Sequence, residues 1–421
     1  MVTILIASVF ILGYIAIAFE HPLMLNKAAS ALITGVLCWT IYILQSKSAD
    51  TVTDELLHHL GEIGSILFFL LGAMTIVALI DSHNGFDIIT QKIKTTSKSK
   101  LLLIITVLTF FLSALLDNLT TAIVMTSLSS KLLVDKEHKL WFCGMIVIAA
   151  NAGGAWSPLG DVTTTMLWIG GQITALNIMK QLLLPSIAVC LLPALIVVYR
   201  FRGLKFKPVP ASTCTRQEKK EGRIVLFAGI GFLIFVPIFK TLTHLPPFMG
   251  MMLALGLMWV ITTIIHKSKE AEEAERFAVS KALQKVDTPS ILFFLGILLA
   301  VSALQSIGLL KELATVLNST LKNDYLIGSA LGLLSAIVDN VPLVAASQGM
   351  YDLSTYPTDH PFWEFLALTT GTGGSAIIIG SAAGVAVMGI EKIDFMWYLK
   401  KISLLALIGF AAGILVFLLQ L

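Results

Sequence analysis

The sequence predicts an all-α polytopic membrane protein with about ten transmembrane helices and two re-entrant hairpins. Three observations carry this prediction: 56% of the 421 residues are hydrophobic, 13% are charged, and the mean hydropathy is +0.88. Such a composition lies outside the range of soluble globular domains. It arises because apolar runs of about 20 residues, the length that crosses a bilayer, recur along the whole chain.

Ten apolar runs have the length that a membrane-spanning helix needs. They cover residues 2–19, 28–45, 62–81, 140–168, 182–200, 222–240, 248–265, 289–310, 363–390 and 401–421. The first run lacks the basic start and the cleavage site of a signal peptide, so we expect it to be a retained span. The four cysteines are scattered singly and fit neither a disulfide framework nor a metal site.

The chain repeats itself weakly and in order. The letters SILFFL begin at residue 65 and again at residue 290. Asp117–Asn118 in LLDNLTTAIVM is matched by Asp339–Asn340 in IVDNVPLVAAS, 222 residues later. Gly153–Gly154 is matched by Gly373–Gly374, 220 residues later. These matches predict two related halves.

Two segments are interpreted as re-entrant hairpins rather than as spans. Residues 101–133 and 325–349 each contain two short apolar stretches that meet at an Asp-Asn pair. Irregular backbone at membrane depth is tolerated only where protein buries it or where it lines a cavity. Lysines flank the first hairpin on both sides and are sparse on both sides of the second, which places their loops on the cytoplasmic and the outer face respectively.

The halves are predicted to be inverted repeats over 1–203 and 222–421, joined by a basic cytoplasmic linker over 204–221. Each half has five crossings, and both termini lie outside. An odd number of crossings inverts one half relative to the other, an architecture common among secondary transporters. All but five of the 29 basic residues then lie in the cytoplasm; the exceptions are Lys47, Lys180, Lys240, Lys311 and Lys322.

Two spans, at about 140–168 and 363–390, are predicted to be broken helices. NAGGAWSPLGDVTTTMLW and TTGTGGSAIIIGSAAGVAVMG place glycines, small hydroxyl residues and one proline in apolar surroundings. Glycine weakens a helix and proline removes a hydrogen bond, so we expect unwound stretches whose carbonyls and helix ends can bind ions. The predicted backbone breaks are Gly153, Gly154, Pro158, Gly373 and Gly374.

Asp117, Asp161 and Asp339 lie within or beside these breaks. A carboxylate deep in a membrane is costly and is therefore usually functional. No Lys, Arg or His stands in the middle of a predicted span or hairpin, so no basic side chain is expected to balance the aspartates. Each is then neutral only when it is protonated or binds a cation.

This pattern predicts a proton-coupled cation exchanger. Clustered carboxylates in a low-dielectric site titrate as a set, so that protons and a metal cation compete for the same oxygens. Carboxylate, amide, hydroxyl and carbonyl oxygens suit a hard cation. The predicted cation- and proton-binding residues are Asp117, Asn118, Thr120, Ser157, Asp161, Thr163, Asp339 and Asn340.

These features also have structural interpretations. An aspartate at a helix junction can simply cap the next helix, which applies most to Asp161, because Ser381 stands at the matching position. Paired glycines can mark close helix packing. An interfacial position is favoured over a role in transport for four groups near predicted span ends: Glu62, Asp81, His83 and Glu364.

The motifs LLDNLTTAIVM, GGAWSPLGDVTTTMLW and VDNVP resemble those of the NhaD-type Na⁺/H⁺ antiporters of the ion transporter superfamily, and the resemblance covers nearly the whole chain. It implies exchange of Na⁺, and also Li⁺, for protons across a bacterial inner membrane by a homodimer. It adds Pro342 to the backbone breaks, while Thr370, Thr372 and Ser375 match less distinctively. The Na⁺ is expected at Asp117, Asp161 and Asp339.

The expected partners are the lipid bilayer, small inorganic cations and protons, with no cofactor, no enzyme activity and no nucleic acid. Three alternatives remain. An anion or metalloid carrier on the same scaffold, for dicarboxylate or arsenite, would favour hydroxyls, amides and helix N-termini without several uncompensated aspartates. A membrane-embedded enzyme would need a nucleophile–base pair or metal-binding histidines within the membrane. A channel fits inverted repeats with broken helices less well than alternating access does.

Overall fold

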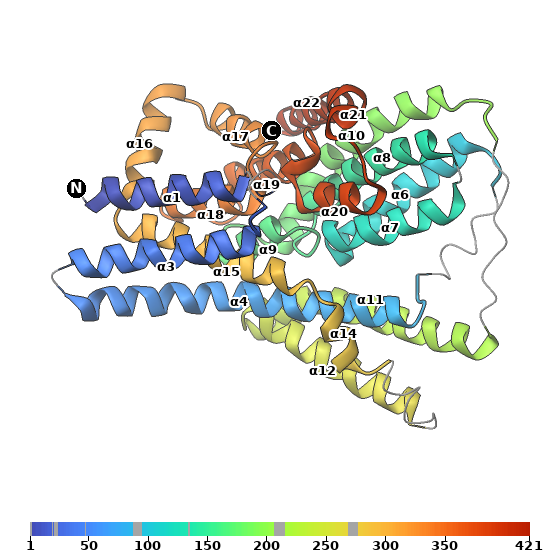
Figure 1. The fold of residues 1–421 in the computed structure, drawn as a ribbon, viewed down its shortest axis with the longest axis horizontal. Helices are drawn as coiled ribbons and strands as arrows, with labels where there is room; N and C mark the ends of the chain where they lie inside the picture. The colour runs from blue at the N-terminus through green and yellow to red at the C-terminus, as the bar shows by residue number, and fades with distance from the viewer. Residues whose placement is uncertain are drawn as a thin grey trace.

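The computed structural model describes residues 2–18, 20, 24–46, 48–86, 95–133, 135–205, 215–267 and 277–421. This part of the chain is almost entirely helical (Figure 1). Eight of its helices are long and apolar enough to cross a membrane. The prediction of an all-α polytopic membrane protein is confirmed.

The helices are named here in chain order. Up to residue 200 they are α1 (Val2–Ala18), α3 (Lys27–Gln45), α4 (Ala49–Ser82), α6 (Lys98–Leu116), α7 (Asn118–Leu132), α8 (Lys136–Ala155), α9 (Val162–Ile169) and α10 (Ala175–Arg200). Beyond it they are α11 (Arg216–Thr243), α12 (Pro247–His266), α14 (Val279–Lys285), α15 (Thr288–Ser306), α16 (Leu309–Leu321), α17 (Asp324–Leu334), α18 (Asn340–Met350), α19 (Pro361–Gly373), the 3₁₀ turn η1 (Ile378–Gly380), α20 (Ala382–Glu391), α21 (Phe395–Lys401) and α22 (Ser403–Gln420).

Helix α4 is longer than the span predicted over 62–81. It begins at Ala49, where the Ser48 hydroxyl accepts a hydrogen bond from the backbone N–H of Thr51 as an N-cap. Glu62 therefore lies inside a helix rather than near its start. The prediction missed this extension because hydropathy marks only the apolar part of a helix.

Helix α11 also begins earlier than predicted, inside the linker assigned to 204–221. A capping box explains the start: Thr215 accepts from the backbone N–H of Glu218, whose carboxylate accepts from the backbone N–H of Thr215. Residues 206–214 of that linker lie outside the described residues, as do Lys92 and Lys94 in the basic flank of the first hairpin.

The first predicted hairpin corresponds to α6 and α7, which are separated only by Asp117. Figure 1 shows α7 running back alongside α6. The Lys98 Nζ at the start of α6 lies 2.8 Å from the Nδ1 of His138, which follows α7. The chain thus returns to the face at which α6 begins. At 19 residues, α6 is longer than the predicted stretch, because Lys98 and its neighbours join the apolar run.

The second predicted hairpin corresponds to α17 and α18, with residues 335–339 between them. The Tyr356 hydroxyl, beyond the end of α18, donates a hydrogen bond to Oδ1 of Asp324 at the start of α17, at 2.7 Å. This hairpin also returns to the face from which it came.

The broken helices pass through the centre of the molecule. Helix α8 is buried from Leu140 to Ala155, and α19 is buried from Phe362 to Gly373. Each is separated from its second arm, α9 or α20, by the non-α-helical residues 156–161 or 374–381. Both interruptions lie in the predicted motifs.

Glycines allow the hairpins to pack directly on the broken helices. A methyl group added at Gly153 of α8 would lie 2.2 Å from the carbonyl oxygen of Phe110 in α6. One added at Gly373 of α19 would lie 1.9 Å from the carbonyl oxygen of Gly332 in α17. Only glycine permits such close backbone approach.

The sequence repeat is accompanied by a repeat of contacts. The Ser113 hydroxyl donates to the carbonyl oxygen of Ala150 at 2.6 Å, and the Ser335 hydroxyl donates to that of Thr370 at 2.8 Å. The two donors are 222 residues apart and the two acceptors 220. Each hairpin is therefore joined to its broken helix by the same hydrogen bond.

Glu364, for which the sequence favours an interfacial position, is enclosed by protein. Its side chain in the first turn of α19 is 1% exposed. One carboxylate oxygen accepts a hydrogen bond from the Asn177 amide of α10 at 2.7 Å. The sequence pattern could not reveal this burial, because the contacting residue, Asn177, is 187 positions away in the chain.

The close packing at Gly373 predicts that alanine destabilises the protein there but not at an unpacked glycine. We expect Gly373→Ala to lower the melting temperature, because overpacking typically costs about 1–3 kcal/mol. The matched control is Gly389→Ala in α20, where nothing lies within 4 Å of an added methyl group. The control should leave the melting temperature unchanged or raise it. Thermal unfolding of both purified variants measures the difference, and equal melting temperatures would contradict the packing.

Candidate functional site

Asp161 lies at the centre of the polar groups buried between the hairpins and the broken helices. Its side chain is 2% exposed. Oδ2 accepts a hydrogen bond from the Asn118 amide at 2.5 Å, and the Asn340 amide lies 3.3 Å from both carboxylate oxygens. Asn118 is the first residue of α7 and Asn340 the first of α18. One carboxylate therefore joins both hairpins.

The position of Asp161 is fixed locally by the start of α9. Asp161 is the N-cap, and its Oδ1 accepts from the backbone N–H of Thr163 at 2.9 Å and from the Thr163 hydroxyl at 2.8 Å. Burial of a carboxylate is tolerable only when hydrogen bonds replace its water. Amide, hydroxyl and backbone donors all contribute here.

Asn151 is a site residue that the sequence analysis missed. It is fully buried in α8, and its Oδ1 accepts from the Asn118 amide at 3.2 Å. Its Nδ2 donates to the hydroxyl oxygens of Ser375 and Ser381, both at 2.9 Å. Asn151 thus connects the first hairpin to the second broken helix. A signal was present, because Asn151 opens the NAGGAW motif as an amide inside an apolar span.

Asp117 occupies the single-residue break between α6 and α7. Its φ angle is 79°, which a non-glycine residue seldom adopts. Its carboxylate accepts from the backbone N–H and from the hydroxyl of Thr120, each at 2.8 Å. The side chain is half-buried and is held against its own helix. Strained backbone of this kind is often found at functional sites.

Asp339 caps α18 in the second hairpin. Its carboxylate accepts from the backbone N–H of Val341 at 3.2 Å, and its side chain is half-buried. Tyr14 of α1 reaches this point, with its phenol oxygen beside the backbone N–H of Asp339. Sequence reasoning missed Tyr14, because nothing in its neighbourhood links α1 to residues over three hundred positions away.

The three aspartates do not form one carboxylate cage. The described part of the chain contains no group of three or more His, Cys, Asp or Glu side chains placed to hold a metal ion. Asp161 is nevertheless within electrostatic range of Asp117 and of Asp339. None of the ion pairs among the described residues includes any of the three, so no basic side chain balances them.

Partial positive charge comes instead from helix ends. Asp117, Asp161 and Asp339 cap α7, α9 and α18, and Ser381 caps α20. The hydrogen bonds through Asn118, Asn340 and Asn151 join α7, α9, α18 and α20 at their N-termini. A helix N-terminus carries roughly half an elementary charge, which favours a nearby carboxylate. The capping interpretation is therefore correct as local structure.

Other predicted residues pack beside this network. The Ser157 hydroxyl donates to the carbonyl oxygen of Ala114 at 2.5 Å, which fixes the first break against its hairpin. Pro158 lies in that break, and its carbonyl oxygen accepts from the Thr165 hydroxyl at 2.8 Å. Pro342 lies in the first turn of α18, where no intrahelical hydrogen bond is lost, and the break itself precedes it.

Of the polar residues in the second broken helix, some belong to the hydrogen-bond network around Asp161 and others do not. The hydroxyls of Thr370 and Thr372 donate to carbonyl oxygens of their own helix, both at 2.6 Å, rather than to a residue of the network. Ser375 belongs to it through Asn151. Gly374 lets the break fold tightly, since a methyl group there would lie 2.6 Å from the carbonyl oxygen of Gly380.

Comparisons with known proteins agree over most of the chain. The model of a family described as citrate transporter matches residues 14–371. The chain is 47% identical to sodium/proton antiporter 1 of Arabidopsis thaliana, over 97% of this chain and 71% of that protein. It is 45% identical to sodium/proton antiporter 2 of the same plant, over 98% of both chains.

A bacterial relative matches over a similar extent. The chain is 32% identical to the Na⁺/H⁺ antiporter NhaD of Vibrio cholerae, over 98% of this chain and 90% of that protein. The family model and these relatives all describe transporters rather than enzymes. The chain therefore belongs to the NhaD-type Na⁺/H⁺ antiporters, within the carriers that the citrate-transporter model describes.

Proposed function

We propose that this chain exchanges Na⁺, and also Li⁺, for protons by alternating access, with Asp117, Asp161 and Asp339 as the competing sites. The observation that carries the proposal is Asp161, a carboxylate that is 2% exposed and is held by amides of both hairpins. The names of the relatives, sodium/proton antiporters of a plant and a bacterium, support the choice of ions.

The asparagines Asn118 and Asn340 can accommodate either a proton or a cation at Asp161. Asn118 and Asn340 donate to an ionised Asp161 through their amide nitrogens. When Asp161 takes up a proton, it becomes a donor, and a rotated amide offers it a carbonyl oxygen. The same rotation turns the amide oxygens toward a cation. The cation then has one carboxylate with neutral oxygens around it, a ligand set that suits a hard ion.

Coupling follows from the cost of an empty site. Charged carboxylates without a counter-ion are expensive within the membrane, so the conformational change that moves the site between the two faces is favoured only when it is loaded. Na⁺ and H⁺ therefore cross in opposite directions. Because the two hairpins meet at Asp161, motion of one predicted inverted repeat against the other would change the face to which the site opens.

The description of the family model raises the alternative of a citrate or other anion carrier. Helix N-termini are good anion sites, and four of them meet here. Three of the four are already capped by the chain's own carboxylates. A citrate ion would therefore be repelled by these carboxylates. Among the described residues, no Lys, Arg or His forms an ion pair with any of the three aspartates. Cation exchange is therefore favoured.

The role of the charge can be separated from the capping role. In everted vesicles with an acid interior, added Na⁺ should collapse the proton gradient, and citrate should not. Asp161→Asn should abolish the response, as should Asp117→Asn and Asp339→Asn. Asparagine caps a helix about as well as aspartate does, so these variants should still fold.

Asp394→Asn is the matched control, because Asp394 is an exposed N-cap of α21 that accepts from the backbone N–H of Trp397 and takes no part in the hydrogen bonds around Asp161. It should keep full exchange. The proton gradient is followed with a pH-sensitive dye. Full activity in Asp161→Asn would remove that carboxylate from the mechanism, and a response to citrate would favour the anion carrier.

The topology forms part of the proposal. We place the chain in a bacterial inner membrane as a homodimer, with both termini periplasmic and with inverted repeats over 1–203 and 222–421. A reporter fused at Ser212 should be cytoplasmic, and one fused at Asp359 should be periplasmic. Alkaline phosphatase and fluorescent-protein fusions read these two positions. Cytoplasmic signal at both would rule out five crossings per half.

A further inference from the structure

A cavity of about 390 Å³ lies between α4, α9, α15 and α18. It has room for roughly a dozen water molecules at about 30 Å³ each. Its polar lining includes His59, Glu62, Ser65, Ser302 and Gln348. Charged and polar side chains are costly against lipid and are tolerated where they face water. The lining therefore indicates a hydrated space rather than a lipid crevice.

The cavity leads toward the aspartates of the proposed site. Its lining includes Met166 of α9, five residues after Asp161, and Ala345 of α18, six residues after Asp339. At 1.5 Å of rise per residue, these wall positions lie about 8–9 Å along the helices from the carboxylate-bearing caps. The Gln348 amide donates to the carbonyl oxygen of Met166 at 3.2 Å and joins α18 to α9.

The other end of α4 lines a smaller cavity of about 160 Å³. That cavity includes Thr120, whose hydroxyl holds Asp117. Between the two cavities α4 is apolar, and Phe69 packs edge-on against Trp168 of α9. Each cavity thus approaches the proposed site from one side, and α4 is the wall that they share.

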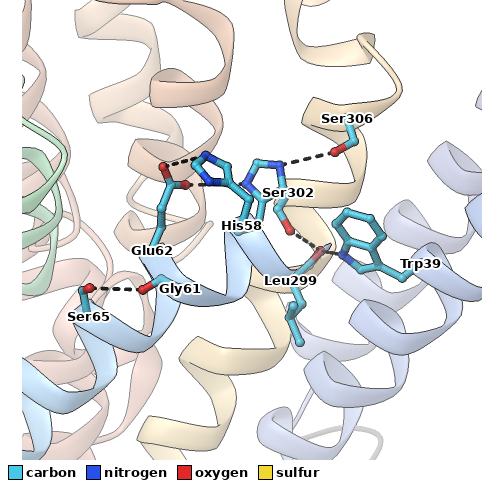
Figure 2. A network of polar contacts seen from close by, with 9 residues as sticks. Trp39, His58, Gly61, Glu62, Ser65, Leu299, Ser302 and Ser306 are labelled. Carbon is cyan, nitrogen blue, oxygen red and sulfur yellow. Dashed lines mark hydrogen bonds and ion pairs between the residues drawn. The ribbon is translucent and has the colours of Figure 1, made fainter. Parts of the chain in front are cut away.

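Glu62 is the acidic residue of the larger cavity, and Figure 2 shows its carboxylate beside the imidazole of His58. His58 Nε2 and His59 Nδ1 each lie 3.6 Å from it, beyond a good hydrogen-bond distance. The other ring nitrogen of His59 lies 3.3 Å from the Ser306 hydroxyl of α15. The Glu62 side chain is 63% exposed, so a cation in the cavity can reach it.

We infer that this cavity is the path by which Na⁺ and protons reach the site from the face that bears the α3–α4 turn, and that Glu62 concentrates cations in it. The inference rests on the proposed function. A single carboxylate in a cleft with low-dielectric walls raises the local cation concentration. The site residues themselves then need only select between ions that are already present.

Thiol labelling tests the path. We expect Ser65→Cys to react with a membrane-impermeant cationic thiol reagent, and the adduct to block exchange. Thr53→Cys, exposed in the first turns of α4 and outside the cavity lining, marks the side of the membrane; it should react from that same side without loss of exchange. Phe68→Cys, on the exposed outer surface of α4, should resist the reagent in lipid.

The background for these variants carries Cys214→Ser, because Cys38, Cys143 and Cys190 are buried. The path is wrong if Ser65→Cys does not react, reacts only from the opposite side to Thr53→Cys, or reacts without loss of exchange. Exchange measured before labelling keeps the two proposals apart. Absence of Na⁺-driven proton movement in the native protein would overturn the proposed function, whereas the side from which Ser65→Cys reacts would still show whether the cavity opens to the face of the α3–α4 turn.

Substitution of Glu62 tests its role. Glu62→Gln should raise the KM for Na⁺ applied at this face by roughly three- to tenfold and leave the maximal rate nearly unchanged. Glu55→Gln is the control, since Glu55 lies two turns earlier on α4, is hydrogen-bonded to Tyr42, and does not line the cavity. It should change neither quantity. An unchanged KM in Glu62→Gln, or a loss of maximal rate alone, would refute the assignment.

Discussion

The structure depends on one buried carboxylate. Asp161 accepts hydrogen bonds from Asn118 of one hairpin and from Asn340 of the other. A charge at this depth is stable only if its surroundings are built around it. The breaks bring helix N-termini to the carboxylate, and glycines such as Gly153 and Gly373 let the hairpins approach closely enough for their amides to reach it.

Capping and transport are not competing interpretations in this molecule. An aspartate at a helix N-terminus has its negative charge stabilised by backbone donors. That stabilisation is partial, so the carboxylate still attracts a proton or a cation. Asp161 therefore serves both as the N-cap of α9 and as the centre of the proposed site. The same atoms define where a helix starts and, in the proposed mechanism, what the protein binds.

The sequence was sufficient for features that follow local rules. Hydropathy, the Asp117–Asn118 and Asp339–Asn340 pairs and the paired glycines located most of the long apolar helices, the turns between α6 and α7 and between α17 and α18, and the motifs that contain the two breaks. The short helices α14, α16 and α21 were not predicted. Features made by tertiary contact were missed. Asn151 acquires its role only from Ser375, 224 residues away, and Glu364 is buried by another helix. The sequence predicted one site formed by three carboxylates. In the structure the residues that reach Asp161 are the first helical residues of α7 and α18, Asn118 and Asn340, whereas the caps Asp117 and Asp339 bond to their own helices.

The internal repeat is broken at the position that sets the charge. Asp161 and Ser381 begin equivalent helices with nearly the same backbone angles, but one is an acid and the other an alcohol. Exchanging the conformations of the two repeats would therefore not regenerate an equivalent molecule. In an alternating cycle the inward-open and outward-open forms would differ in energy even between identical solutions. Such a carrier would have a built-in resting orientation, on which the effect of the ion gradients is superimposed.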